Sequence, residues 1–321
     1  MRRQYLHLLK LLSVGTGLAL AGQPAMGAHR RAGLDRPLTT TVGFQLYRDY
    51  LIVVQGSVGQ LKGLNFLLDT GTSPSVLTPR LAERLHLNPT SAVLAVLSGN
   101  VRSGFATVPS LEFGPVRAVN LPVMFADLSV LQSVLPIPID GVVGLDVLGQ
   151  SAFEIDYVSR TLRFGPAAAM PNSFSISIPL QIENGLAVVD ATVNHASAHL
   201  VLDTGAATLV VFKPAPSPAP NGSAPAGPVP TGPVPTGPAP TGLKPVSAPP
   251  LPRSLPEVEH REISLASFSL GDAEFGHEPA FVVPNPVDAG HDFDGLMSPA
   301  ALGIKRVAVD LARGTLAFTL E

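Results

Sequence analysis

Two short acidic segments of this chain have the residue types needed for acid–base chemistry on water. They are Asp69-Thr70-Gly71 and Asp203-Thr204-Gly205, and each directly follows an apolar triplet. A buried strand ending there would bring the carboxylate to the edge of the core. The threonine can hydrogen-bond an opposing loop, and the glycine permits a tight turn. We therefore expect the two loops to face each other.

Two facing carboxylates cannot both be ionised, so they share one proton and titrate as a pair. The ionised member can take a proton from a water molecule, while the protonated member hydrogen-bonds the oxygen of a carbonyl under attack. We predict Asp69 and Asp203 as the catalytic pair, with no metal and no cofactor. The predicted supporting residues are Thr70, Gly71, Thr72, Thr204 and Gly205.

The elements that would position these loops occur twice. Leu51–Val54 precedes the first loop as Leu186–Val189 precedes the second. Downstream, Asp140-Gly141-Val142-Val143 corresponds to Asp294-Gly295-Leu296-Met297, and a closing Asp…Thr-Leu…Phe pattern follows each at the same spacing. A repeat this long indicates a duplicated lobe, because solenoid repeats are only ~20–50 residues. Short β-branched and aliphatic runs between turn residues predict strands, so we expect an all-β fold with lobes at 28–170 and 171–321.

The segments Phe66–Ser73 and Leu200–Ala206 resemble the active-site loops of the pepsin-like and retropepsin-like aspartic protease superfamily. Ile139–Gly144 resembles the segment that threads behind such a loop. The resemblance implies a bilobal acid-protease fold, with two barrel-like lobes related by a pseudo-two-fold axis and a cleft between them. It also implies an aspartic endopeptidase that hydrolyses extended peptide or protein substrates, with apolar side chains flanking the cut.

The second half departs from the family pattern at two positions. Ala206 stands where the first half has Thr72, and Ser298 replaces the glycine that Gly144 provides. We therefore expect Asp69 to be the more readily ionised aspartate. The departures leave open an alternative function, in which the chain retains the fold as a non-catalytic peptide- or envelope-polymer-binding protein.

Pepsin-like enzymes close over substrate with a hairpin flap that usually carries a tyrosine. The matching interval, about Val96 to Val108, has no tyrosine, and Phe105 is the candidate flap residue. Its side chain either covers substrate or packs beneath the hairpin. Asp140 and Asp294 are interpreted as turn residues, and His195 and His199 as hairpin surface rather than metal ligands.

Composition narrows the partners and the compartment. The 321 residues carry a net charge of −3 and include no cysteine, so a nucleic-acid partner is not expected and disulfides are excluded. Residues 1–27 have the order of a signal peptide, a basic start with Arg2 and Arg3 followed by the apolar run Leu11–Gly22. The sequence does not choose between a general secretory and a twin-arginine signal. We expect an exported protein, periplasmic or secreted.

Two half-sites in one chain predict a monomer, and no apolar run reaches the ~20 residues of a membrane span. Residues 213–256 contain a tract that repeats Pro and Thr-Gly. We predict that this tract is a disordered insertion in the second lobe.

Overall fold

The computed structural model describes residues 40–97, 99–132, 134–165, 174–213, 260–284 and 293–320. The predicted signal peptide at 1–27, the start of the first lobe at 28 and the lobe boundary at 170/171 lie outside these residues. So does all but the first residue of the predicted insertion at 213–256.

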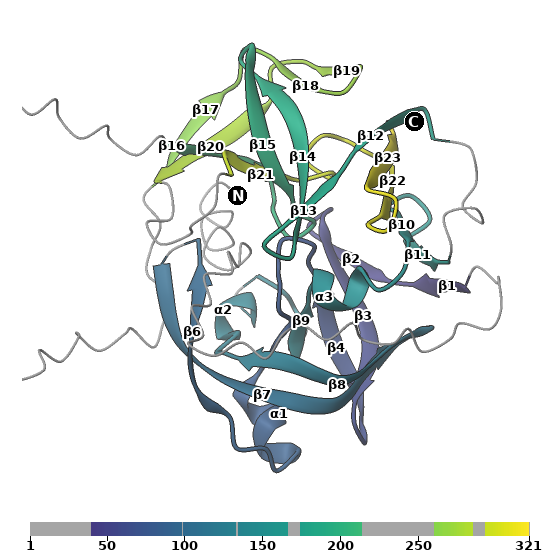
Figure 1. Ribbon diagram of the computed structural model, residues 1–321, viewed down its shortest axis with the longest axis vertical. Coiled ribbons are helices and arrows are strands. Elements are labelled where there is room, and N and C mark those ends of the chain that lie inside the picture. Colours follow the sequence, from purple (N-terminus) through teal and green to yellow (C-terminus); the bar gives the residue numbers. More distant parts are fainter. Residues whose placement is uncertain are drawn as a thin grey trace, which may run out of the picture.

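The regular structure of the described residues is almost entirely β, as predicted (Figure 1). The described helices are three short ones: α1 (Pro79–Arg84), α2 (Ser129–Gln132) and α3 (Leu145–Leu148). Helix α1 follows the first Asp-Thr-Gly loop. Its proline lies in the first turn, where the missing N–H is not needed. Leu81 and Ala82 form the buried face of the helix.

The first lobe is built on an eight-stranded sheet in the order β2-β3-β4-β9-β5-β8-β7-β6. The central strands are continuously buried only where they lie near the acidic loop, at Leu51–Val54, Phe66–Leu68 and Gly141–Val143, so apolar runs replace strict alternation there. The strands are β2 (Gln45–Tyr47), β3 (Leu51–Val58), β4 (Leu61–Leu68), β5 (Val76–Leu77), β6 (Thr90–Val96), β7 (Gly99–Phe113), β8 (Val116–Phe125) and β9 (Gly141–Val143).

The second lobe has a nine-stranded sheet in the order β17-β20-β16-β21-β15-β14-β18-β19, with β13 paired to β14. Figure 1 shows this green and yellow lobe above the purple and blue first lobe. The strands are β13 (Gln181–Glu183), β14 (Leu186–Val193), β15 (Ala196–Leu202), β16 (Leu209–Lys213), β17 (Arg261–Ser264), β18 (Phe268–Leu270), β19 (Ala273–Phe275), β20 (Pro279–Pro284) and β21 (Gly295–Met297).

The two lobes repeat one topology around the acidic loops. In the first, β4 runs parallel to β9, which is antiparallel to β5, which is parallel to β8. In the second, β15, β21, β16 and β20 repeat these three pairings in the same order and sense. The structure thus confirms the bilobal, duplicated fold.

A six-stranded sheet joins the halves, in the order β1-β11-β10-β22-β23-β12. At its centre β10 from the first half pairs antiparallel with β22 from the second. Buried side chains of this sheet belong to the same apolar cluster as the interiors of both lobes. Its strands are β1 (Thr40–Gly43), β10 (Phe153–Asp156), β11 (Thr161–Phe164), β12 (Ile176–Pro179), β22 (Arg306–Asp310) and β23 (Thr315–Thr319).

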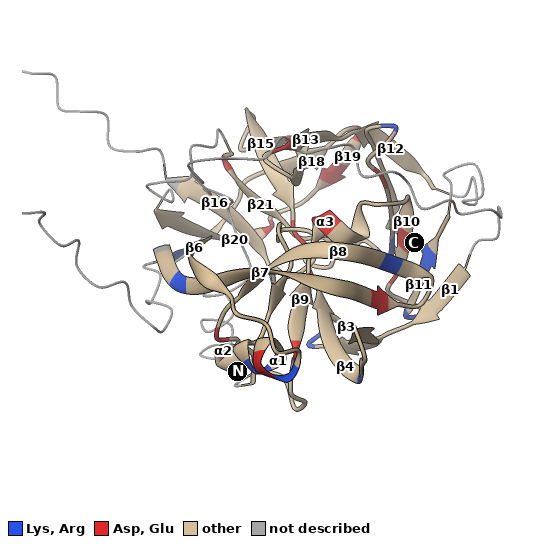
Figure 2. Ribbon diagram, turned by 60° about the horizontal axis from the view of Figure 1, so that its bottom comes forward, with Lys and Arg blue, Asp and Glu red and all other residues tan. Residues whose placement is uncertain are grey.

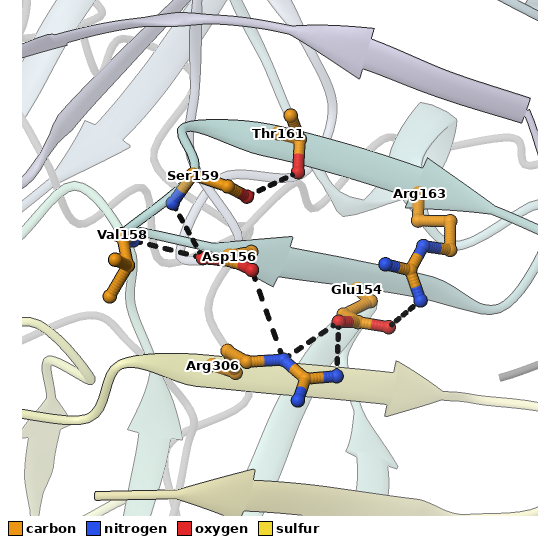
Figure 3. A network of polar contacts seen from close by, with 7 residues as sticks. All are labelled: Glu154, Asp156, Val158, Ser159, Thr161, Arg163 and Arg306. Carbon is orange, nitrogen blue, oxygen red and sulfur yellow. Dashed lines mark hydrogen bonds and ion pairs between the residues drawn. The ribbon is translucent and has the colours of Figure 1, made fainter. Parts of the chain in front are cut away.

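An ion-pair network also crosses this sheet (Figure 3). The Glu154 carboxylate is only 1% exposed and lies 3.1 Å from Arg163 Nη1 and 2.8 Å from Arg306 Nη2. Elsewhere charge is sparse, and the blue and red segments of Figure 2 are short and scattered.

Candidate active site

The two Asp-Thr-Gly loops meet where the lobes face each other. Strands β4 and β15 end directly before Asp69 and Asp203. The strands parallel to these two, β9 and β21, hold the aspartate backbones. Asp69 N–H donates to Val143 O at 3.0 Å, and Asp203 N–H donates to Met297 O at 2.9 Å. Both aspartates are fully buried. The structure therefore brings together the two carboxylates that the sequence singles out.

Reciprocal hydrogen bonds between the threonines tie one loop to the other. Thr70 Oγ1 donates to Leu202 O at 2.7 Å and accepts from Thr204 N–H at 3.1 Å. In the mirror arrangement, Thr204 Oγ1 donates to Leu68 O at 3.3 Å and accepts from Thr70 N–H at 3.1 Å. Four bonds between buried groups fix the separation of the loops, since breaking any one leaves a polar group unpaired.

The glycines bring backbone donors close to the carboxylates. Gly71 N–H and Gly205 N–H each donate at 2.8 Å to the Oδ1 atom of the aspartate two residues earlier. A Cβ atom on Gly71 would lie 2.7 Å from Asp203 Cγ, so only glycine lets the first loop approach the opposite carboxyl this closely. The two carboxyl groups also hydrogen-bond each other.

The two aspartates have unequal surroundings. Burial raises the pKa of Asp69 to about 6, and hydrogen bonds from Thr72, Asp203 and Gly71 limit the rise. Burial also raises the pKa of Asp203 well above its usual value, and the neighbouring charge of Asp69 raises it further. Thr72 Oγ1 donates to Asp69 Oδ2 at 2.7 Å, whereas Ala206 has no hydroxyl to offer. Asp69 is thus the member that ionises first.

The first loop is held from behind by a close backbone contact. Leu145 N–H donates to Thr72 O at 2.8 Å. A Cβ atom on Gly144 would lie only 2.2 Å from that same oxygen, so a side chain at this position would push the loop away.

The second loop obtains the same support by another route. Pro299, at the position of Leu145, has no N–H to donate. Ser298 Oγ instead donates to Ala206 O at 2.7 Å. The serine that breaks the family pattern therefore restores a bond that the following proline removes. Sequence comparison of the halves shows both changes, but not that one compensates the other.

The predicted flap is the hairpin of β6 and β7, and its tip lies at the start of the predicted interval. Leu97, in the turn, is buried and belongs to an apolar cluster whose other members are second-lobe side chains, including Val201, Val210 and Leu296. Phe105 lies further along β7, paired with Thr90 and Met124, and packs against the first-lobe cluster. The structure therefore packs Phe105 against the first lobe and Leu97 against the second lobe.

The remaining candidate residues lie away from the dyad. Asp140 Oδ2 accepts from Asn65 N–H at 3.0 Å, and Asp294 Oδ2 accepts from His199 N–H at 2.9 Å, so both aspartates cap backbone at strand ends. His195 is in the turn of the β14–β15 hairpin, and exposed His199 pairs with Asp190 at 2.8 Å.

Within the described ranges, no three or more His, Asp or Glu side chains gather in a group suited to a metal ion. Over the same ranges, no helix combines the length and apolar character that a membrane crossing requires.

Comparison with known proteins bears on the first lobe most directly. Residues 54–147 match the sequence model of a family described as aspartyl protease. Among solved structures, a retropepsin-like aspartic protease from Rickettsia conorii is 19% identical, with 40% of this chain and 92% of that chain covered and a TM-score of 0.31. Basic 7S globulin from soybean is 13% identical, with 89% of this chain and 95% of that chain covered and a TM-score of 0.47. No curated protein matches the chain.

Proposed function

As this chain is a member of the aspartic protease superfamily, we propose that it is an aspartic-type endopeptidase acting through Asp69 and Asp203. One observation carries the proposal. Two fully buried carboxyl groups, supplied by corresponding loops of the two lobes, hydrogen-bond each other and differ in pKa. Burying a pair of this kind costs stability, and such costly groups cluster at functional sites.

In the proposed reaction, ionised Asp69 accepts a proton from a water molecule held between the carboxyls. The water oxygen attacks the peptide carbonyl carbon while protonated Asp203 donates a hydrogen bond to the carbonyl oxygen. A proton then passes to the amide nitrogen, the C–N bond breaks, and an acid and an amine leave. The hairpin with Leu97 must open to admit substrate, because neither aspartate is exposed to solvent.

The direction of the pKa changes fixes the expected pH profile. The reactive state needs Asp69 ionised and Asp203 protonated. Activity should therefore rise as pH increases through about 6, where Asp69 loses its proton, and fall at higher pH when Asp203 is deprotonated.

The choice of substrate follows from the resemblance of the two acidic loops to those of aspartic proteases. We propose extended peptide or protein substrates with apolar side chains flanking the cut. On the basis of residues 1–27 we also propose that the protein acts outside the cytoplasm, and because one chain supplies both half-sites we propose that it acts as a monomer.

The test is hydrolysis of an unfolded protein between about pH 3 and pH 8 by the native chain and by Asp69→Asn and Asp203→Asn. Asp140→Asn is the matched control, because it removes a first-lobe carboxylate that only caps backbone. We expect activity in the native chain and the control alone. An inert native chain, or full activity in both dyad variants, rejects the proposal. Peptide binding without hydrolysis would favour the alternative, a peptide- or envelope-polymer-binding protein.

A further inference from the structure

A partly buried acid lies behind the first Asp-Thr-Gly loop. Asp146, in the first turn of α3, accepts two hydrogen bonds from Ser75, one from the backbone N–H at 3.0 Å and one from Oγ at 2.7 Å. Burial raises the pKa of Asp146. No described lysine or arginine forms an ion pair with it.

A continuous set of hydrogen bonds leads from this acid to the dyad. Ser75 Oγ, while donating to Asp146, accepts from Gly144 N–H at 2.9 Å. The next residue, Leu145, donates its N–H to Thr72 O at 2.8 Å, and Thr72 Oγ1 donates to Asp69 Oδ2 at 2.7 Å. The Gly144–Leu145 segment is thus fixed at one end by Ser75 and holds Thr72 at the other.

The second half lacks this arrangement. Leu209 corresponds to Ser75, since each lies six residues after the aspartate of its loop. Ala300 corresponds to Asp146, since each lies three residues after the end of its strand, β21 or β9. Neither side chain can form the hydrogen bonds seen in the first half. A partly buried carboxylate with no cation beside it tends to lower stability. Its presence behind only one of the two loops indicates a task specific to Asp69.

We propose that Asp146 is a positioning residue: through Ser75 and the Gly144–Leu145 segment, it holds the Thr72 hydroxyl on Asp69 and thereby assigns the role of base to Asp69. The inference rests on the proposed endopeptidase function for its catalytic meaning. Its physical content, the placement of one hydroxyl on one carboxylate, can be measured separately.

The expected effect follows from the strength of a hydrogen bond to a charged group. Loss of the Thr72 bond should raise the pKa of Asp69 by roughly one to two pH units. Thr72→Val removes the bond directly. Asp146→Ala should produce a rise in the same direction but smaller, because Thr72 is displaced rather than deleted. At a pH one unit below the pKa that Asp69 has in the native chain, kcat of the variants should be several-fold lower than that of the native chain, while KM is nearly unchanged.

The experiment is a ¹³C-carboxyl NMR titration of the full chain, with Asp69 assigned from the Asp69→Asn spectrum. The variants are Thr72→Val, Asp146→Ala, their combination, and Asp140→Ala as the matched control. Asp140 is a first-lobe carboxylate that also accepts a backbone N–H, from Asn65, but caps the strand at a distance from Thr72. We expect the pKa of Asp69 to rise in both single variants, with no further rise in the combination and no change in the control.

Three results would overturn the inference: an unchanged titration in Asp146→Ala, a combined effect equal to the sum of the single effects, or an equal shift in the control. If Asp146→Ala does not fold, Ser75→Ala tests the same connection, and Asp146→Asn, which keeps an acceptor for Ser75, should restore most of the native titration. A shifted titration in a chain that hydrolyses nothing supports the positioning role while rejecting the proposed function. Hydrolysis by a chain whose Asp69 titration does not depend on Asp146 rejects only the positioning role.

Discussion

The raised pKa of Asp69 predicts that the dyad destabilises the folded chain as pH increases. The pKa rises from the usual 3.8 to about 6 on burial. Between these values the folded state holds a proton that the unfolded state has released, so the free energy of unfolding falls with increasing pH. A difference of about 2 pH units corresponds to a loss of about 3 kcal/mol, complete above about pH 6.

The assay isolates Asp69 by using Asp203→Asn as the background. The asparagine amide can still donate a hydrogen bond to Asp69, and the variant should not digest itself. Urea unfolding is followed at several pH values from about 3.5 to 7 and compared with the double variant Asp69→Asn/Asp203→Asn, which has no dyad carboxylate to titrate. Relative to the double variant, the single variant should lose about 3 kcal/mol across this range, or roughly 6–12 °C in Tm.

Two outcomes would refute this reasoning. Parallel pH dependences, within about 1 kcal/mol, would mean that burial does not raise the pKa of Asp69. A single variant that gains stability with increasing pH would mean that Gly71 and Thr72 stabilise the anion by more than burial costs, and the pKa would then lie below its usual value.

Three further substitutions test other parts of the structure. Thr70→Val leaves Leu202 O and Thr204 N–H buried without partners and should cost about 2–6 kcal/mol, measured by urea unfolding; a loss below about 1 kcal/mol would show that the cross-loop bonds are dispensable. Glu154→Gln weakens the contacts to two partly exposed arginines and should cost about 2–3 kcal/mol by the same measurement, with an unchanged stability counting against the network. Leu97→Ala should cost about 2–5 kcal/mol and increase hydrogen exchange in β6 and β7, whereas unchanged exchange would mean that Leu97 does not hold the hairpin closed.

The sequence predicts most of the architecture because the chain repeats itself. Two Asp-Thr-Gly loops with matching apolar runs before and after them indicate the lobes, and buried strands such as β3 and β14 follow from their β-branched content. The pairing of Asp69 with Asp203 follows from that symmetry.

Three features of the site could not be predicted in the same way. The role of Ser298 depends on a backbone bond that Pro299 cannot make, and this bond is visible only once Leu145 is seen donating to Thr72. Leu97 contacts side chains more than 80 residues away, for which local pattern gives no signal. Asp146 resembles an ordinary helix-start acid, and only a position-by-position comparison with Ala300 marks it as unusual.

The sheet that joins the halves determines when the chain can complete its fold during synthesis. Strand β10 ends at Asp156 and its partner β22 begins at Arg306. The edge of β10 that pairs with β22 therefore stays unpaired until about 150 more residues have been synthesised. At roughly 5–20 residues per second this delay is about 8–30 s. During that time a nascent chain exposes a β edge that invites mispairing, and it lacks the loop that would complete the proposed catalytic pair. The architecture would therefore delay the proposed hydrolysis until both halves have been made, and it leaves the unfinished chain prone to aggregation.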